Sequence, residues 1–145
     1  MFQNLSILFL SFFLCIGKLA SAQALTVSIE NIQTSQKGDI IVGVYNNSEH
    51  FTTIGKEVIG KSIAVANNEK EVLTFTDLPA GTYSIAVFHD ANQNGKLDKN
   101  WLGIPKEGYG FSKNIFGSLG PPTFKETNFD WHPSQTLQLS IGLKY

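Results

Sequence analysis

The sequence predicts an all-β protein, an antiparallel β-sandwich of six to seven strands that carries one long ordered aromatic loop. Short stretches alternate apolar and polar residues with the period of two that is expected of a half-buried strand. Turn-forming Gly, Pro, Asn and Asp separate these stretches at intervals of about 8–12 residues, as in β-sandwiches. No stretch carries a convincing helical period. Together these patterns favour two packed sheets over a helical fold.

The first 22 residues have the features of a signal peptide. Residues 5–16 form an apolar run that is short for a membrane span, and residues 20–22 (Ala-Ser-Ala) provide a small-x-small cleavage site. We therefore expect cleavage after this site and a single β-sandwich domain over residues 23–145. Residues 1–4 contain no Lys or Arg, so an uncleaved anchor is the alternative.

Removal of this segment changes the composition of the chain. It takes away Cys15 and Lys18, so that no cysteine remains and the formal net charge changes from −1 to −2. Export without disulfides fits a bacterial protein in the periplasm, at the outer membrane or outside the cell better than a small animal ectodomain. No basic excess is present to hold phosphates, so nucleic acid is not an expected partner. No later apolar run is long enough to cross a bilayer.

The expected strands of the first half follow the apolar alternation. Residues 25–30 alternate strictly, and residues 40–45 are β-branched and mostly apolar, with a turn at 34–38 between them. Residues 49–60 show no clear pattern and are expected to form a loop or a short helical turn. Residues 62–66 are expected to form a third strand, which ends at an Asn-Asn turn.

Residues 82–89 are expected to form the central strand of the fold. A strand at 72–76 leads into it through a compact turn in which Pro79 and Gly81 set the backbone. Both faces of the central segment are apolar. One face carries Tyr83, Ile85 and Val87, and the other carries Ala86 and Phe88. A strand of this kind lies in the middle of a sheet or is covered on both sides.

The second half contains the longest stretch without strand or helix periodicity, residues 101–124. This stretch is rich in glycine and aromatic residues, so we expect an ordered loop packed by its own side chains. Residues 127–131 and 137–145 are expected to form the last two strands, the second with the clearest alternation in the chain.

Residues 89–100 (HDANQNGKLDKN) have the pattern of a calcium-binding loop. Asp90, Asn92 and Asn94 stand at every second position, and Gly95 follows them. Ca²⁺ takes about six to eight oxygen ligands at about 2.3–2.6 Å, and alternating Asp and Asn side chains on a curled backbone bring several oxygens to one point. Gly95 permits the sharp turn because glycine adopts positive φ at little steric cost.

The spacing also departs from that of an EF-hand. Counted from Asp90, the later ligand positions fall on the backbone carbonyl of Lys96 and on Asp98, but the position of the bidentate Glu is Trp101. We therefore expect a weak Ca²⁺ site on a β-domain, completed by Asp98 or by Glu107. The alternative is a tight Asn-Gly turn with solvated polar residues, since the same residue types favour any turn.

Two segments resemble known families. Residues 75–83 (FTDLPAGTY) resemble the strand-turn-strand of transthyretin-like, carboxypeptidase-regulatory-like and Cna-B-type sandwiches. Residues 103–112 (GIPKEGYGFS), after the Asp-x-Asn-x-Asn-Gly loop, are similar to the bacterial family known as domain of unknown function 2141, as are residues 24–145 as a whole. The resemblance implies an exported prealbumin-like or immunoglobulin-like sandwich without an established activity.

The chain also resembles adhesin B-type repeats, in which a similar Asp/Asn loop binds calcium. Those loops carry an acidic residue where this chain has Trp101, so the resemblance extends only to the four side chains Asp90, Asn92, Asn94 and Asp98.

The expected function is that of a non-enzymatic module at the cell envelope, which binds Ca²⁺ and an unknown protein or glycan partner. Trp101, Tyr109 and Phe111 are the candidate contact surface, because aromatic residues supply much of the energy where proteins or sugars bind. The alternative is that these three side chains pack as a small satellite core. A small-ligand carrier that forms an oligomer is a second possible function.

A metal-assisted hydrolase is the third possibility, because Glu107 and Ser112 lie close in sequence to the possible metal site. No Gly-x-Ser-x-Gly elbow, zinc-binding helix or phosphate-binding loop is present in the sequence. His89 and Asp90 are neighbours in an expected strand, so their side chains point to opposite faces and cannot form a catalytic dyad. We therefore expect no enzymatic activity.

Overall fold

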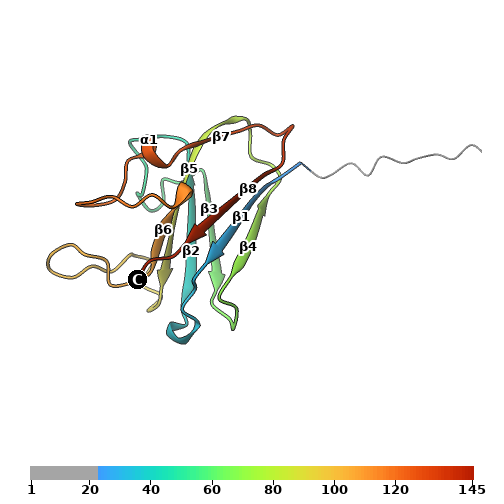
Figure 1. Cartoon of the computed structure of the whole chain (residues 1–145). Helices are drawn as coiled ribbons and strands as arrows, with labels where there is room; N and C mark the ends of the chain where they lie inside the picture. The colour runs from blue at the N-terminus through green and yellow to red at the C-terminus, as the bar shows by residue number, and fades with distance from the viewer. Residues whose placement is uncertain (1–22) are drawn as a thin grey trace, which may run out of the picture.

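The computed structural model describes residues 23–145 and contains two β-sheets packed face to face (Figure 1). The expected signal peptide, residues 1–22, lies outside the described residues. The strands are β1 Leu25–Glu30, β2 Asp39–Tyr45, β3 Ile59–Ala64, β4 Glu71–Phe75, β5 Gly81–Asp90, β6 Tyr109–Phe111, β7 Phe129–Trp131 and β8 Leu137–Gly142. Two 3₁₀ turns, η1 Thr34–Gln36 and η2 Ser112–Asn114, and one helical turn, α1 Phe124–Thr127, complete the described chain. The all-β sandwich is therefore confirmed.

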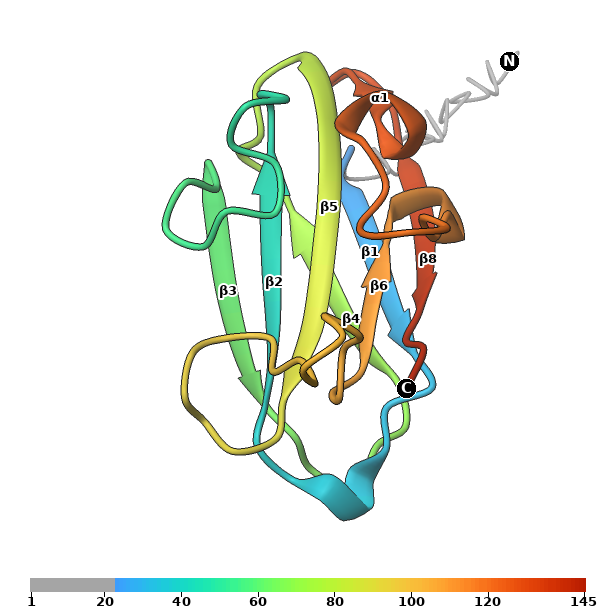
Figure 2. The same ribbon diagram turned by 90° about the vertical axis from the view of Figure 1, so that its left-hand side faces the viewer.

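The smaller sheet has the strand order β4-β1-β8, and the larger sheet has the order β3-β2-β5-β6. β5 is the longest strand, and it pairs with β2 on one side and with both β6 and β7 on the other. Figure 2 shows β5 running through the middle of the larger sheet, with the smaller sheet behind it. The prediction that this segment is the central strand is confirmed.

The pairing of β1 with β8 is parallel, with Leu25 opposite Leu137, whereas every other pair of named strands is antiparallel. A tight hairpin can join only antiparallel strands, and β1 and β8 are the first and last strands of the described chain. All the other strands lie between them in the chain, so no tight turn forces β1 and β8 to be antiparallel.

The main core lies between the two sheets and follows the alternation in the sequence. Leu25, Val27 and Ile29 of β1 are fully buried, and they face buried β-branched residues of the larger sheet such as Val42 and Val87. The polar residues between them on β1 point outward and are only partly buried. Burial of each such apolar side chain contributes about 1.5–3 kcal/mol to the stability of the sandwich.

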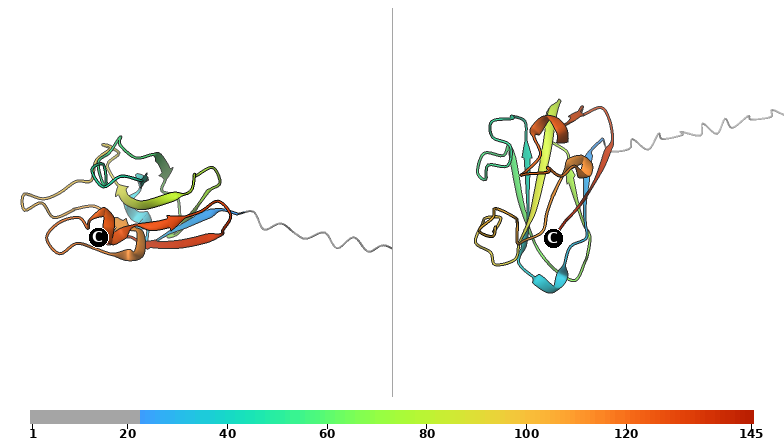
Figure 3. Two further views of the ribbon diagram at one scale, coloured as in Figure 1. Left: turned by 90° about the horizontal axis from the view of Figure 1, so that it is seen from above. Right: turned by 60° about the vertical axis from the view of Figure 1, so that its left-hand side comes forward.

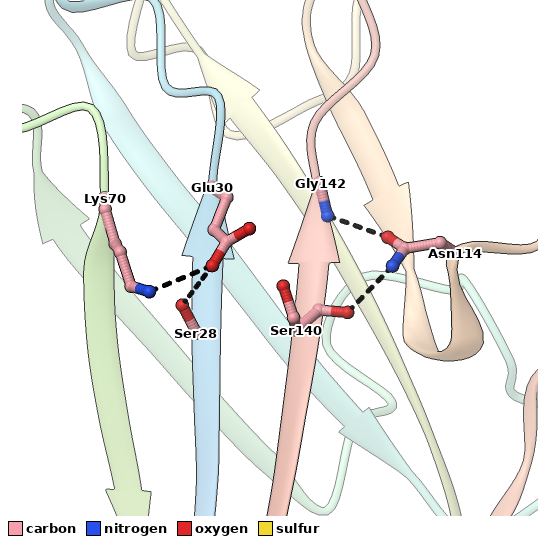
Figure 4. Close-up of polar contacts among 6 residues, drawn as sticks. All are labelled: Ser28, Glu30, Lys70, Asn114, Ser140 and Gly142. Carbon is pink, nitrogen blue, oxygen red and sulfur yellow. Dashed lines mark hydrogen bonds and ion pairs between the residues drawn. The ribbon is translucent and has the colours of Figure 1, made fainter.

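The outer face of the smaller sheet is polar, and it carries the side-chain contacts that Figure 4 shows. The Glu30 carboxylate accepts hydrogen bonds from Lys70 at 2.9 Å and from Ser28 at 3.1 Å. The hydrogen bond from Lys70 is the main reason that the pKa of Glu30 lies below its usual value.

Asn114 covers the free edge of β8 (Figure 4). Its amide nitrogen donates to the Ser140 carbonyl at 3.0 Å, and its amide oxygen accepts from the Gly142 N–H at 2.8 Å. Just beyond β8, the Tyr109 and Lys144 backbones exchange two hydrogen bonds of 2.9 Å, which join the two sheets. Pairing an exposed strand edge in this way removes a site for unwanted association.

Several element boundaries differ from those predicted. β3 begins at Ile59, earlier than the predicted 62–66, and β8 ends at Gly142 although the alternation continues to residue 145. β6 was not predicted and lies inside the predicted aromatic loop. Thr127 belongs to α1, so the strand expected at 127–131 begins at Phe129. Among residues 23–145, no helix has the length and apolar character needed to cross a membrane.

Candidate functional site

The candidate calcium loop lies between β5 and β6, and it begins at the last residue of β5, Asp90. In Figure 2 the segment 91–108 lies in front of the lower parts of β2 and β3. Figure 3 shows that this segment and the segment 115–123 project from the sandwich on the same side.

Asp90 is almost fully buried, and its carboxylate folds the start of the loop. One oxygen, Oδ1, accepts the Asn94 N–H at 3.0 Å, and the other, Oδ2, accepts the Gly95 N–H at 2.7 Å. Gly95 has a φ of +76°, a left-handed backbone conformation that glycine adopts at little steric cost. The predicted turn at Gly95 is therefore confirmed.

Asp98 brings the two asparagine side chains together. Its carboxylate accepts from Nδ2 of Asn92 at 2.7 Å and from Nδ2 of Asn94 at 3.1 Å. The amide oxygens of these asparagines accept backbone N–H groups two residues ahead, those of Asn94 at 3.2 Å and Lys96 at 2.9 Å. Four of the predicted ligand residues therefore lie in one hydrogen-bonded group.

Glu107 closes the base of the loop. It is buried, and it reaches back from the end of the loop to accept the Ala91 N–H at 2.9 Å and the Asp98 N–H at 2.9 Å, one on each carboxylate oxygen. Lys106 N–H also donates to the Asp98 carbonyl at 2.8 Å. Glu107 therefore holds the two ends of segment 91–98 at a fixed separation.

The side chains of segment 90–98 offer oxygen atoms, which a hard cation prefers as ligands. They offer few carboxylates, however. Among residues 23–145, no three His, Cys, Asp or Glu side chains gather at one point that could hold a metal ion. Segment 90–98 offers the two carboxylates of Asp90 and Asp98, and its other oxygens are neutral. Glu107 adds a carboxylate at the base of the loop, where both of its oxygens already accept backbone N–H groups. A cation at Asp98 would need the amides of Asn92 and Asn94 turned so that oxygen, not nitrogen, faces it.

The structure separates the three aromatic residues of the candidate contact surface. Trp101 is 90% exposed at the tip of the loop. Phe111 is buried and Tyr109 partly buried in a second cluster on the outer face of the larger sheet. This outer aromatic cluster consists of Tyr45, Phe51, Tyr109, Phe111, Phe116 and Phe124, with ring centroids about 6 Å apart. The satellite core weighed in the sequence analysis therefore exists for Tyr109 and Phe111, but Trp101 is not part of it.

The hydroxyl of Tyr45 lies at the edge of this cluster, 3.4 Å from the Thr53 carbonyl. Burial, together with the nearby negative charge of Glu57, raises the pKa of Tyr45 to about 12.

His89 and Asp90 do point to opposite faces, as predicted. His89 is fully buried between the sheets, where its Nε2 contacts the Lys37 carbonyl and its Nδ1 lies 2.8 Å from the Tyr145 hydroxyl. The carbonyl can only accept, so Nε2 carries the proton and Nδ1 accepts from Tyr145. Tyr145 in turn accepts the Gln33 N–H at 3.0 Å. His89 therefore attaches the last residue of the chain to the core.

Ser112, the other residue of the hydrolase alternative, is also fully buried. Its hydroxyl donates to the Thr127 carbonyl at 2.6 Å and accepts the Ile85 N–H at 3.0 Å. These contacts fix α1 and η2 against β5.

The sequence analysis missed a groove of about 970 Å³ on the outer face of the larger sheet. Its floor is formed by residues of β2, β3, β5 and β6, and its walls by the loops 46–58, 91–108 and 115–122. One feature of the sequence pointed toward this groove: both faces of residues 82–89 are apolar, which indicates that something covers the outer face of this strand as well. The sequence did not indicate which loops cover it.

Comparisons with known proteins point to one family. No curated protein and no solved structure matches the chain. The model of the family described as "Uncharacterized protein conserved in bacteria (DUF2141)" matches residues 27–138, which run from β1 into β8 and include the candidate loop and the outer aromatic cluster. The chain therefore belongs to this bacterial family, DUF2141.

Proposed function

We propose that the protein is an exported, non-enzymatic β-sandwich module that acts in binding or structure at the bacterial cell envelope and holds Ca²⁺ in the loop 90–98. The membership in a bacterial family and the signal-peptide pattern of residues 1–22 support the cellular setting. The observation that carries the calcium proposal is the convergence of Asn92 and Asn94 on the Asp98 carboxylate.

Each residue of the loop has a distinct role in this proposal. Asp98 supplies negative charge to the ion, and Asn92 and Asn94 supply neutral oxygens once their amides turn. Asp90 keeps the turn at Gly95 closed, and Glu107 holds the base of the loop. Both oxygens of each carboxylate accept backbone N–H groups, so these two residues act one layer further out and add negative charge behind the ion.

The affinity should be low. Asp98 is the one carboxylate of segment 90–98 whose oxygens are not held by backbone N–H groups, and the same loop carries the exposed lysines Lys96 and Lys99. Extracellular modules with few charged ligands bind Ca²⁺ with dissociation constants on the order of 10⁻⁴–10⁻³ M. At such concentrations the ion binds the folded chain and raises its melting temperature by mass action.

The test is thermal melting of residues 23–145 in EDTA and in increasing Ca²⁺, for the wild type, Asp98→Asn and Asp77→Asn. We expect a rise in melting temperature that saturates on the order of 10⁻³ M for the wild type and is lost in D98N. D77N is the matched control, because Asp77 is an exposed aspartate in the β4–β5 turn. Equal melting in EDTA and Ca²⁺, or an equal loss of the shift in D77N, would contradict the calcium proposal.

A small-ligand carrier is the second candidate function, and the groove on the larger sheet favours it. Its volume of about 970 Å³ lies within the usual range of small-molecule sites, about 300–1,000 Å³. The carrier and calcium functions are compatible, because the loop 91–108 forms one wall of the groove.

A further inference from the structure

The floor of the groove is an apolar sheet face that the surrounding loops cover only in part, and its residues Ile41 and Phe88 are half-buried. Strand register places Ile41 of β2 beside Phe88 of β5, and Phe88 beside Tyr109 of β6, in one row across the sheet. The next row contains Gly43 and Ala86. The Tyr45 ring lies over Gly43, where a Cβ would be 2.8 Å from it, and Ala86 packs against the outer aromatic cluster. These residues point away from the main core, so the packing of the two sheets does not require them to be apolar.

The rim of the groove carries large apolar residues that have little to pack against. Ile54 comes from the loop 46–58, Leu102 and Ile104 from the loop 91–108, and Leu119 from the loop 115–122. Each of these four side chains is more than half exposed. Three loops that are far apart in the sequence thus place exposed apolar side chains around one groove, a pattern that marks a binding surface.

The charges at the groove are unbalanced. Lys96, Lys99 and Lys144 line it, against the single carboxylate of Glu57. Among residues 23–145 the one ion pair joins Lys70 to Glu30, so none of these three lysines has a carboxylate partner there. Two of the groove's lysines lie over aromatic rings: Lys144 is 5.6 Å from the Phe116 centroid, and Lys61, which also borders the groove, is 4.7 Å from the Phe75 centroid. Lys96 and Lys99 have no such contact among residues 23–145. The groove is therefore positive on a chain whose acidic residues outnumber its basic ones by 12 to 11.

We infer that this groove binds a free single-chain amphiphile with an anionic head, such as a long-chain carboxylate. The acyl chain lies along the apolar floor over Ile41 and Phe88, and the head group lies at the end of the groove lined by Lys96 and Lys99. This inference rests on the binding role proposed above but not on the calcium site.

The backbone of the floor disfavours a peptide as the occupant. β2 and β5 are paired on both sides, so they have no free N–H or C=O groups to which an extended peptide could add as a strand. These two central strands can therefore recognise an occupant only by its apolar surface and its charge. An anionic amphiphile offers both in one molecule.

The experiment is a calorimetric titration of residues 23–145 with dodecanoate, in EDTA and below its micelle concentration. Dodecyltrimethylammonium is the second probe, since it has the same chain length and a positive head. We expect one dodecanoate to bind per chain, and dodecyltrimethylammonium to bind at least about tenfold more weakly, a difference of about 1.4 kcal/mol.

Two variants test the two parts of the groove, each with a matched control. The double variant K96E/K99E should weaken dodecanoate binding about tenfold, whereas K113E/K125E, which changes two lysines outside the groove, should leave it unchanged. The variant I104D should weaken binding by a similar factor, whereas V72D should not. Val72 is 54% exposed on the other sheet and Ile104 is 55% exposed, so both substitutions should be compatible with folding.

Several results would overturn the inference. They are absence of dodecanoate binding, equal affinity for the cationic probe, or equal weakening by the control variants. Binding to phosphatidylglycerol vesicles but not to free dodecanoate would assign the groove to a membrane surface instead. A dimer in sedimentation that I104D, but not V72D, dissociates would assign it to a second copy of the chain.

The calcium proposal can fail separately, because its test contains no amphiphile and this one contains no Ca²⁺. A calcium-dependent melting shift without dodecanoate binding would overturn the groove inference alone. Dodecanoate binding without the melting shift would overturn the calcium site alone.

Discussion

Buried carboxylates at the start and end of the loop 91–108 show how single residues shape the candidate site. Asp90 and Glu107 together accept four backbone N–H groups of the loop, and each oxygen holds one of them. Hydrogen bonds to a charged acceptor are roughly twice as strong as neutral ones. The loop is thus held by its own side chains before any ion is considered.

Replacing Glu107 with Ala should therefore loosen the loop. The change leaves the N–H groups of Ala91 and Asp98 without acceptors, and each lost acceptor costs about 1–3 kcal/mol where the donor stays buried. We expect E107A to lower the free energy of unfolding in urea by about 2 kcal/mol. Glu69→Ala is the control, since Glu69 is exposed and its side chain should contribute little. Equal stability of E107A and E69A would show that the carboxylate does not hold the loop.

Tyr45 should make the protein less stable at high pH. Its pKa is about 12 in the folded chain, above the ordinary value of 10.0, mainly because of burial. A raised pKa means that the folded state binds the phenolic proton more tightly than the unfolded state. The contribution of this group is therefore complete below pH 10 and is lost as the pH rises from about 10 to about 12.

The variant Tyr45→Phe isolates this effect. Burial also raises the pKa of Tyr83 and of Tyr145, so both proteins should lose stability in this range. Melting temperature plotted against pH should fall less steeply above pH 10 for Y45F than for the wild type. Parallel curves would mean that Tyr45 does not release its proton differently in the folded and unfolded chains.

At the scale of elements, the start of β2 is built against the end of β5. Gly38 precedes β2 with a φ of +80°, and a Cβ at this position would lie 2.2 Å from the Asp90 carbonyl oxygen. Its own carbonyl accepts the Val65 N–H at 2.8 Å, which attaches β3 to the same point. The candidate loop therefore begins at a place where three strands meet closely.

A pair of glycine substitutions separates backbone strain from this close approach. Gly95 has nearly the same φ as Gly38, +76°, but a Cβ there would have no atom within 4 Å. Gly95→Ala should cost only the backbone strain, about 1–2 kcal/mol. Gly38→Ala should cost clearly more in the free energy of unfolding, because it also displaces the backbone at Asp90. Equal costs in urea denaturation would contradict the close contact.

The elements also show what the sequence could predict. Strict alternation of apolar residues predicted β1 and β8, and mostly apolar runs predicted β2, β4 and β5, because each of these strands has one face in the main core. β6 is only three residues long and contains a glycine, so it has too little pattern to be recognised. It forms because β5 offers an unpaired edge, which is a property of the assembled sheet.

The candidate site was predictable to a similar degree. The alternating Asp and Asn residues and the turn at Gly95 were visible in the sequence, and the structure brings Asp90, Asn92, Asn94 and Asp98 into one group. The use of Glu107 as an acceptor of backbone N–H groups was not visible, because it depends on where the chain returns. The groove depends on three loops at once, so no local pattern could reveal it.

At the scale of the whole molecule, the two faces of the larger sheet differ in what they contact. The inner face packs on the smaller sheet and provides the main core. The outer face carries the aromatic cluster and the groove, and the three long connections gather over it (Figure 2). The stable part of the fold and the part available for binding thus share the same strands.

The parallel pairing of β1 with β8 has a consequence for folding during synthesis. The N-terminal part of a polypeptide leaves the ribosome first. One edge of β1 therefore stays unpaired until Leu137 and the residues after it have emerged. Contacts between such distant segments form slowly because a large loop must close first. A nascent molecule of this kind can complete its smaller sheet only after residue 142 has emerged from the ribosome.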